Sequence, residues 1–382
     1  MIPDRTILPR TARRLAAFVT SVVTTAGWAC APVGPAGGAP LPPFGGVPAL
    51  TWISEFTRPA GAPYPQIADP ARFGSLSGLV RDAASGQWVG VIDDREGSRV
   101  AWLAITASGN RLDVSPVRVQ VLRAGAEVPN RTATEADLEA IVSQPDGSFL
   151  MGEEGHVTDE EVWPPAILQV TRDGVVTGVI PYPDEFQISA DGKTGTRGNQ
   201  GFESLTRTPS GRVIAGLEQP LADRPITTFE RGGEGRLIEF EPHGATFRPG
   251  RQWRYQISPT PKVAEFPGVC PDGENGLVEL LAITETTLIA LERACLQNAD
   301  QTAVFNPISL FAVTLSGDTA RKTLLVDLST LVPKLSPALA HLDNFEGLAF
   351  GPPVDGMRTL LVMSDDNFRA TQKTSFLLFG MR

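Results

Sequence analysis

The chain has 382 residues, of which 42% are apolar and 20% are charged, which is typical of a globular protein large enough for one large all-β domain or two ordinary domains. A formal net charge of -10 disfavours nucleic acid and anionic membrane surfaces as partners, because both are bound by basic surfaces. The 38 glycines and 33 prolines predict many turns.

Residues 1–30 are typical of an export signal. A charged start that ends at Arg14 precedes a mildly apolar, uncharged stretch at 15–29, and small residues follow it. Cleavage before Cys30 would leave a lipidated cysteine, whereas cleavage after Ala31 would release a soluble form; Gly27 counts against the lipoprotein. A twin-arginine signal and an uncleaved amphipathic N-terminus are the other interpretations. We expect an exported protein that is periplasmic, tethered to a membrane as a lipoprotein, or secreted, with no transmembrane span.

Residues 31–47 are rich in Gly and Pro and predict a tether without a core. The rest of the chain, 48–382, is predicted to be the folded domain. Its first strand, at 49–55, stands apart. Short segments rich in Val, Ile, Leu or Phe and bounded by turn residues then follow in groups of four. The predicted strands of the four complete groups lie at 77–81, 87–92, 99–105 and 117–122; at 138–142, 148–152, 166–171 and 175–182; at 204–208, 212–217, 236–240 and 252–257; and at 278–283, 287–291, 309–315 and 322–328. A fifth group has three predicted strands, at 347–350, 358–363 and 375–380.

The groups recur along the chain. Their first members stand at 77, 139, 203, 279 and 346, and the steps between them are 62, 64, 76 and 67 residues. Repetition of this length with strand-type patterning predicts an all-β fold, a β-propeller of four-stranded blades. We expect five blades, the last completed by the N-terminal strand; six would result if the connections 219–235 or 294–308 hide strands. One short helix is predicted at 331–341.

Acidic residues recur at the start of the first strand and the end of the second strand of each group. Because paired strands run antiparallel, both places lie on one face of the propeller, near its axis. The acids of this predicted face are Asp93, Asp94, Glu139, Glu153, Glu154, Glu203, Glu218, Glu279, Glu292, Glu346, Asp365 and Asp366. Two carboxylates ~5 Å apart repel by roughly 3 kcal/mol at an effective dielectric of 20, so such a ring needs cations, protons or arginines.

Calcium fits this face best, because the side chains offer oxygen ligands and the three histidines lie outside the repeated positions, which disfavours zinc. The alternative is that each acid accepts backbone N–H groups of a neighbouring loop and locks the blades together. The predicted metal ligands are Glu139, Glu203, Glu218, Glu279, Glu346, Asp365 and Asp366. The predicted substrate-binding residues are Arg197, Arg293, Asn367, Arg369 and Lys373, whose alternative role is ion pairing with those acids.

A disulfide is predicted between Cys270 and Cys295. The first precedes a strand that begins near Glu279 and the second follows a strand that ends near Glu292, and antiparallel pairing brings such positions together. Export favours oxidation of the pair. Two unrelated buried thiols are the alternative.

Several motifs resemble the phytase-like domain family, also called esterase-like activity of phytase. They are Gly-Phe-Glu-Ser-Leu at 201–205, Leu-Glu-Gln-Pro-Leu at 217–221, Leu-Glu-Arg at 291–293, Asp-Asn-Phe-Glu-Gly at 343–347 and Ser-Asp-Asp-Asn-Phe at 364–368. The resemblance covers roughly 70–380 and implies an exported bacterial propeller protein that acts as a phosphoesterase on phytate-like substrates. The motif positions that carry over are Glu139, Glu203, Glu346, Asp365, Asp366 and Asn367. Two groups depart from the pattern, with Ser77 in place of Glu and with Glu279 preceded by Val278.

The first hypothesis for function is therefore an exported, Ca²⁺-dependent phosphoesterase that acts on a small-molecule phosphate ester, expected to be a monomer. The second is a non-catalytic exported propeller whose acidic face binds a ligand or a protein. The third is a metal-dependent lactonase or sugar-ester hydrolase. The sequence does not choose the substrate.

Overall fold

The computed structural model describes residues 46–64, 67, 73–125, 134–158 and 161–382. The expected export signal at 1–30, the lipidation site Cys30 and nearly all of the tether at 31–47 lie outside the described residues. Within the described part of the chain, no helix is both long enough and apolar enough to cross a membrane.

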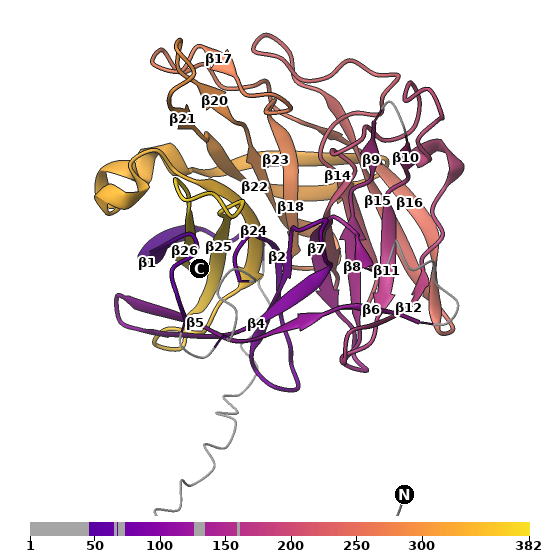
Figure 1. Ribbon diagram of the computed structural model, residues 1–382, viewed down its shortest axis with the longest axis horizontal. Coiled ribbons are helices and arrows are strands. Elements are labelled where there is room, and N and C mark those ends of the chain that lie inside the picture. The colour runs from indigo at the N-terminus through magenta and orange to yellow at the C-terminus, as the bar shows by residue number, and fades with distance from the viewer. Residues whose placement is uncertain (1–45, 65–66, 68–72, 126–133, 159–160) are drawn as a thin grey trace, which may run out of the picture. The chain divides into compact units, whose positions relative to one another are not determined.

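The chain from 46 onward forms five blades, each an antiparallel sheet of four main strands (Figure 1). Blade 1 contains β2 (Leu76–Arg81), β3 (Trp88–Ile92), β4 (Arg99–Ser108) and β5 (Arg111–Val121). Blade 2 contains β7 (Leu138–Ser143), β8 (Phe149–Glu153), β11 (Ala166–Val170) and β12 (Val175–Val179), with β6 (Arg123–Ala124) on its outer edge. Blade 3 contains β13 (Phe202–Arg207), β14 (Val213–Leu217), β15 (Glu234–His243) and β16 (Thr246–Gln256). Blade 4 contains β18 (Gly276–Ala282), β19 (Thr287–Arg293), β22 (Ile308–Ser316) and β23 (Thr319–Asp327). Blade 5 contains β24 (Asn344–Phe350), β25 (Arg358–Asp365), β26 (Lys373–Met381) and β1 (Leu50–Pro59).

The blades close into a ring, as predicted. The innermost strands contact one another in the cyclic order β2, β7, β13, β18 and β24, and β24 contacts β2 again. The last blade is completed by the opposite end of the chain, because β1 pairs antiparallel with β26; Figure 1 shows the indigo strand beside the yellow one. Blades 3 and 4 also touch at their outer edges, where β16 and β23 pair parallel over two residues. The fold is a five-bladed β-propeller.

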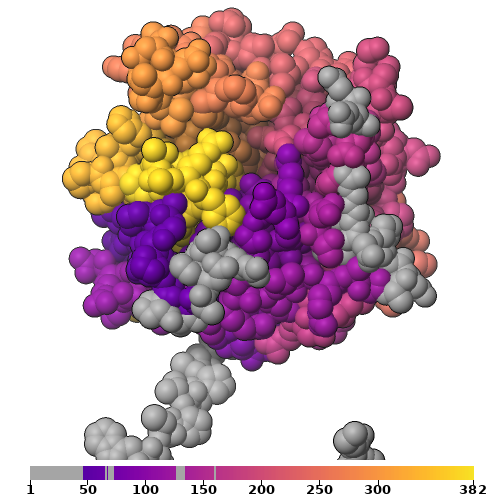
Figure 2. Space-filling view, in the orientation of Figure 1, coloured from indigo at the N-terminus to yellow at the C-terminus, as the bar shows by residue number. Residues whose placement is uncertain are grey.

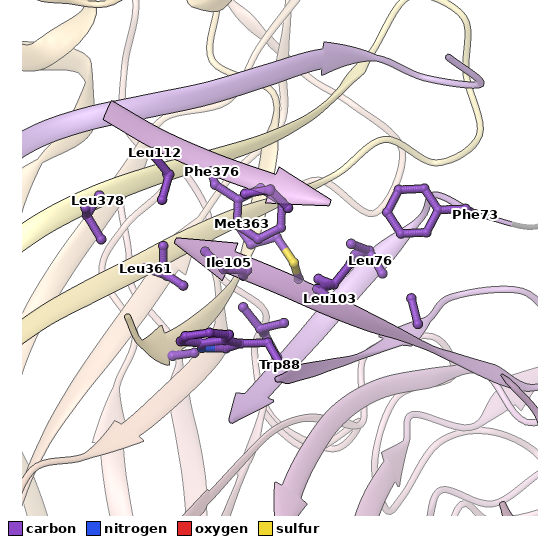
Figure 3. Close-up of a cluster of buried hydrophobic side chains, with 14 of the residues drawn as sticks. Phe73, Leu76, Trp88, Leu103, Ile105, Leu112, Leu361, Met363, Phe376 and Leu378 are labelled. Atoms are coloured by element: carbon purple, nitrogen blue, oxygen red, sulfur yellow. The ribbon is translucent and has the colours of Figure 1, made fainter. Parts of the chain in front are cut away.

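The hydrophobic core is divided into five layers, each between two neighbouring blades. Figure 3 shows the layer between blades 5 and 1, where Trp88 and Leu103 of blade 1 face Leu361 and Met363 of blade 5. The inner strands of each blade are buried on both faces, which explains why their sequences are nearly continuously apolar. Removal of apolar surface from water on both faces of every sheet stabilises the ring without one central core.

The connections differ from the prediction in two places. The segment predicted as a helix at 331–341 forms two 3-10 turns instead, η3 (Leu328–Lys334) and η4 (Pro337–Leu339), because Pro333 and Pro337 interrupt the α-helical hydrogen bonds. The segment 294–308 does hold two short strands, β20 (Leu296–Gln297) and β21 (Val304–Phe305), but they pair with β17 (Gly268–Val269) in a small separate sheet. The remaining short elements are β9 (His156–Val157), β10 (Val162–Trp163) and η2 (Asp184–Phe186).

The predicted disulfide between Cys270 and Cys295 is confirmed. It joins the segments that precede β18 and follow β19, with the two Cα atoms 5.4 Å apart. Two backbone hydrogen bonds also hold these segments together: the N–H of Cys270 donates to the carbonyl of Cys295 at 2.9 Å, and the N–H of Cys295 donates to the carbonyl of Gly273 at 2.8 Å. The disulfide therefore anchors the small sheet of β17, β20 and β21 to the face of blade 4.

Candidate metal and substrate cavity

A β-bulge at the start of each innermost strand sets up the site. In every blade the register between the first and second strands shifts at this point. A bulge leaves one residue out of the pairing and redirects its side chain. The residues left out, here called the bulge row, are Ser77 with Gly78 in blade 1, Glu139 in blade 2, Glu203 in blade 3, Val278 in blade 4 and Glu346 in blade 5.

A second row forms where the second strand of each blade ends. The register pairs Ile92, Glu153, Leu217, Glu292 and Ser364 with the residue before each bulge. The residues that directly follow these, here called the strand-end row, are Asp93, Glu154, Glu218, Arg293 and Asp365. Four of the five blades thus contribute an acid to this row, and blade 4 contributes an arginine.

The two rows meet around the axis. Ser77 Oγ donates a hydrogen bond to Glu346 Oε2 at 3.1 Å, although β2 and β24 belong to opposite ends of the chain. Asn344 donates its side-chain amide to Glu346 and, at 3.4 Å, to Asp365 Oδ2. The side chains of both rows, apart from Ser77 and Val278, line one cavity of about 1380 Å³. Eight of the twelve acids predicted for one face line this cavity: Asp93, Asp94, Glu139, Glu154, Glu203, Glu218, Glu346 and Asp365.

Not every predicted acid of that face lines the cavity. Glu279 stands one residue after its bulge, and its carboxylate accepts hydrogen bonds from the backbone of Leu280, Leu205 and Leu348, which lie in its own blade and in both neighbours. Asp366 accepts from the backbone N–H groups of Ser75 and Phe368 at 2.9 and 3.0 Å. These two carboxylates join neighbouring blades.

Glu292 also contacts neighbouring strands and does not line the cavity, but its partners are side chains of blades 3 and 4 and of the segment between them. Its carboxylate accepts hydrogen bonds from Tyr255 Oη at 2.8 Å and from the side-chain amide of Asn275 at 2.9 Å, and it forms an ion pair with Lys322. The next residue, Arg293, occupies the strand-end row in this blade. Blade 4 therefore has a cation at the position where the other blades have an acid.

A cluster of three carboxylates that could hold a metal ion lies on the side of blades 1 and 2. Asp93, Asp137 and Glu139 each offer a ligand oxygen, and these three atoms all lie within 4.8 Å of one another. Arg95 lies over them: its guanidinium, 40% exposed, pairs with Asp137 and lies 3.5 Å from Glu154 Oε1. This arginine also donates to the side chain of Asn199.

The pKa values of the cavity acids report this crowding. Burial, followed by repulsion from Glu203, raises the pKa of Glu139 well above its ordinary value. Burial also raises the pKa of Glu218 to about 8, against the opposing attraction of Arg293. The pKa of Asp365 rises to about 8 through burial and the charge of Glu346. Asp137 is the exception: burial acts to raise its pKa, but hydrogen bonds from Asp93 and Glu154 and the charge of Arg95 outweigh that effect and lower it.

The predicted cationic and amide residues fall into two groups. Arg293, Asn367, Arg369 and Lys373 line the same cavity as the acids. Lys373 lies near the rim, with Nζ 3.5 Å from Asp343 Oδ2. Arg197 lies elsewhere and donates to the backbone carbonyls of Pro220 at 3.1 Å and of Arg224 at 2.7 Å.

Asp137 and Arg95 are not among the site residues predicted from the sequence. Asp137 stands two residues before Glu139, and Asn344 likewise stands two residues before Glu346. A polar residue two positions before the bulged glutamate is the sequence feature that could have predicted Asp137 as a site residue. Arg95 lies in the turn between β3 and β4, and no motif marks it.

The fold and the site together define a five-bladed propeller with an acidic cavity at its axis. Residues 71–368 match the family model "Phytase-like", described as esterase-like activity of phytase. The chain belongs to the phytase-like family. No curated protein matches the chain significantly.

Solved structures with a similar fold share little sequence with the chain. Endo-arabinase from Bacteroides thetaiotaomicron is 10% identical, with a TM-score of 0.43 over 85% of this chain and 96% of that one. The gluconolactonase XC5397 from Xanthomonas campestris is 11% identical, with a TM-score of 0.35 over 86% of this chain and 98% of that one. The Dos1 propeller is 6% identical, with a TM-score of 0.34 over 80% of this chain and 68% of that one. Similarities this weak carry no argument about activity.

Proposed function

We propose that the protein is an exported phosphoesterase that acts on small phosphate esters with Ca²⁺ held by the axial carboxylates. The observation that carries the proposal is the convergence of Asp93, Asp137 and Glu139, with ligand atoms within 4.8 Å of one another, in a cavity of about 1380 Å³. Membership of a family described by an esterase-like activity of phytase supports the reaction class.

The donor set fits calcium. Ca²⁺ binds six to eight oxygen ligands and accepts irregular geometry, and the carboxylates here are oxygen donors. No N–H or hydroxyl group of the described residues donates a hydrogen bond to Asp137 Oδ1 or Glu154 Oε2, although each side chain is only 4% exposed. A buried carboxylate oxygen without a donor is unfavourable unless a cation or a water meets it. Asp93, Asp137 and Glu139 would hold the ion, with Glu154 beside them.

The remaining predicted ligands lie in two settings. Glu203, Glu218, Glu346 and Asp365 line the same cavity and surround the site with further carboxyl oxygens. Glu279 and Asp366 support it from outside, because their oxygens accept the backbone hydrogen bonds described above. Their role in the proposal is to fix the blades that carry the ligands.

The chain's own cations suit a phosphate ester. A bound divalent cation supplies positive charge toward phosphate oxygens and Lewis acidity toward water. At the rim, Lys373 and Arg369 are placed to bind the outer oxygens of the phosphate, and Asn367 offers an amide donor. Arg95, 40% exposed above Asp137, lies between solvent and the acids and is placed to contact the same anion. In their ionised form, the buried carboxylates below can accept a proton released from the attacking water, and their raised pKa values make them stronger bases than an exposed carboxylate.

Export remains part of the proposal. The disulfide between Cys270 and Cys295 is typical of proteins that fold in an oxidising compartment. Such compartments also supply the calcium that a weak extracellular-type site needs, since those sites bind in the range of about 10⁻⁴ to 10⁻³ M.

The test is an assay of chelator-treated and calcium-loaded protein on phytate and on an aryl phosphate. We expect phosphate release that depends on Ca²⁺ and falls when Lys373→Ala removes a rim cation. Absence of turnover on both substrates would overturn the proposal. Thermal stabilisation by calcium without turnover would instead indicate a ligand-binding propeller, and hydrolysis of a lactone without phosphatase activity would indicate a lactonase.

A further inference from the structure

Arg293 occupies the one strand-end position of the axis that does not carry an acid. The register places it in blade 4 where the other blades have Asp93, Glu154, Glu218 and Asp365. The bulge residue of the same blade is Val278. Blade 4 therefore brings a cation and no carboxylate to the axis, and both of its predicted acids, Glu279 and Glu292, are displaced by one residue into contacts between strands.

The guanidinium of Arg293 bridges acids from two other blades. Its Nη2 atom lies 3.6 Å from Glu218 Oε1, at the end of blade 3's second strand, and 3.3 Å from Glu346 Oε1, in the bulge of blade 5. The side chain is 14% exposed. A charge held this deep acts on its neighbours far more strongly than a surface arginine, because solvent screens it less.

Among the described residues, no cation that lines the other side of the cavity is buried as deeply as Arg293. Asp93, Asp137 and Glu139 of blades 1 and 2 bring their ligand atoms within 4.8 Å of one another. The Asp137 side chain is only 4% exposed, and no N–H or hydroxyl group in the described part of the chain donates a hydrogen bond to its Oδ1 atom. Arg95 reaches the same acids from the surface, but its guanidinium is 40% exposed. Within the described chain, the axial acids therefore divide into a half neutralised from inside by Arg293 and a half left for a cation from outside.

We infer that Arg293 is a built-in counter-ion that takes the place of a second metal ion, so that the cavity holds a single divalent cation on the side of blades 1 and 2. The inference rests on the metal site of the proposed function and adds its stoichiometry and position. Metal pairs in phosphoesterases clamp a phosphate between two positive centres. Here an arginine supplies the second centre, a residue whose planar fork suits both carboxylate and phosphate.

The experiment counts bound Ca²⁺ by isothermal titration calorimetry and equilibrium dialysis, without any assay of turnover. Wild type and Arg293→Lys, which keeps the charge, are expected to bind one ion. Arg293→Gln is expected to bind a second ion, or to bind the first at least about tenfold more tightly, because a positive charge beside the acids has been removed. Asp318→Asn, which changes an acid whose side chain is 75% exposed on an outer strand turn, is the control and should match wild type.

Each outcome decides the inference. Two or more ions in wild type, or unchanged stoichiometry and affinity in Arg293→Gln, would overturn it even if calcium-dependent turnover were found. Binding by Arg293→Gln but not by wild type would also overturn it, because the inference requires one ion in wild type, and would remove calcium from the proposed function. If neither wild type nor Arg293→Gln binds Ca²⁺, both this inference and the calcium site of the proposed function are overturned. If Arg293→Gln does not fold, the ion count of wild type together with that of Arg293→Lys still decides, since one ion in each supports the inference and two in either contradicts it.

Discussion

Asp137 is the residue on which the metal site depends most directly. It is 3% exposed, it lies beside Asp93 and Glu139, and one of its oxygens accepts from no N–H or hydroxyl group of the described residues. We expect Asp137→Asn to weaken Ca²⁺ binding by about tenfold or more, because a charged ligand becomes a neutral one with a single acceptor oxygen. Calorimetric titration of the chelator-treated protein measures this.

The matched control for Asp137→Asn is Asp366→Asn. Asp366 is equally buried, at 1% exposure, but its oxygens accept hydrogen bonds from Ser75, Phe368 and Thr374. This variant should lose stability while calcium affinity stays near the wild-type value. Equal loss of affinity in both variants would show that the effect is structural and would count against Asp137 as a ligand.

The difference between acids that line the cavity and acids that join blades was not readable from the sequence. Glu203 and Glu279 each follow the start of an innermost strand, yet Glu203 is the bulged residue and Glu279 comes just after the bulge. A bulge depends on how two strands pair, and one residue of shift sends a side chain to the other face. The sequence therefore predicted that acids would gather on one face, but not which of them would reach the axis.

At the scale of elements, one carboxylate joins the turns between the first two strands of blades 3 and 4. Glu285, in the turn between β18 and β19, accepts from Ser210 Oγ at 2.7 Å and from Arg212 Nη2 at 2.9 Å, both at the turn between β13 and β14. Burial acts to raise its pKa, but the hydrogen bonds from Arg212 and Ser210 dominate and lower it from 4.5 to about 2. A carboxylate with a depressed pKa stabilises the fold above its unfolded pKa and loses that effect as the pH falls through its folded value.

We expect Glu285→Gln to lower the free energy of unfolding at pH 6 by about 1 kcal/mol, a small value because the side chain is 40% exposed and solvent screens the pair. The difference from wild type should shrink as the pH falls from about 4.5 toward 2. Urea unfolding at several pH values measures it. Glu241→Gln, an acid of similar exposure paired with Arg248 within a single hairpin, is the control. A difference that stays constant down to pH 2 would contradict the assignment.

Some outer strands are longer than the sequence predicted. The strand predicted at 117–122 is β5, Arg111–Val121, and the one predicted at 236–240 is β15, Glu234–His243. The residues that the prediction missed are not continuously buried. At the start of β5, for example, buried and exposed positions alternate. Outer strands face solvent on one side, so a search for apolar runs finds only their buried parts. Inner strands, buried on both faces, were placed to within a few residues.

At the scale of the whole molecule, ring closure links the ends of the chain to the site. β1 pairs with β26 from Leu50 opposite Met381 to Pro59 opposite Lys373. The same β26 begins at Lys373, which lines the cavity, and its neighbour β25 ends at Asp365 in the strand-end row. The strand that closes the fold therefore also supports two elements that carry cavity residues.

Removal of residues 1–59 should open the ring. Blade 5 would keep three strands, and the edge of β26 would lose its partner, which favours association with other chains. Leu50, Trp52, Ile53 and Phe56 are partly buried against the layers on both sides of blade 5, and at about 1 kcal/mol for each half-buried side chain their loss costs on the order of 4 kcal/mol. We expect a lower urea midpoint and oligomers in size-exclusion chromatography.

The control for this truncation is removal of residues 1–45, which leaves β1 in place and should behave as the full chain does. A synthetic peptide of residues 46–60, added in trans, should restore the monomer and raise the midpoint, because the edge of β26 offers the same backbone partners to a separate strand. Restoration should also slow hydrogen exchange at the amides of β26. A truncated chain that stays monomeric with the midpoint of the full chain would show that three strands suffice for blade 5 and that the ring closes through its inner strands alone.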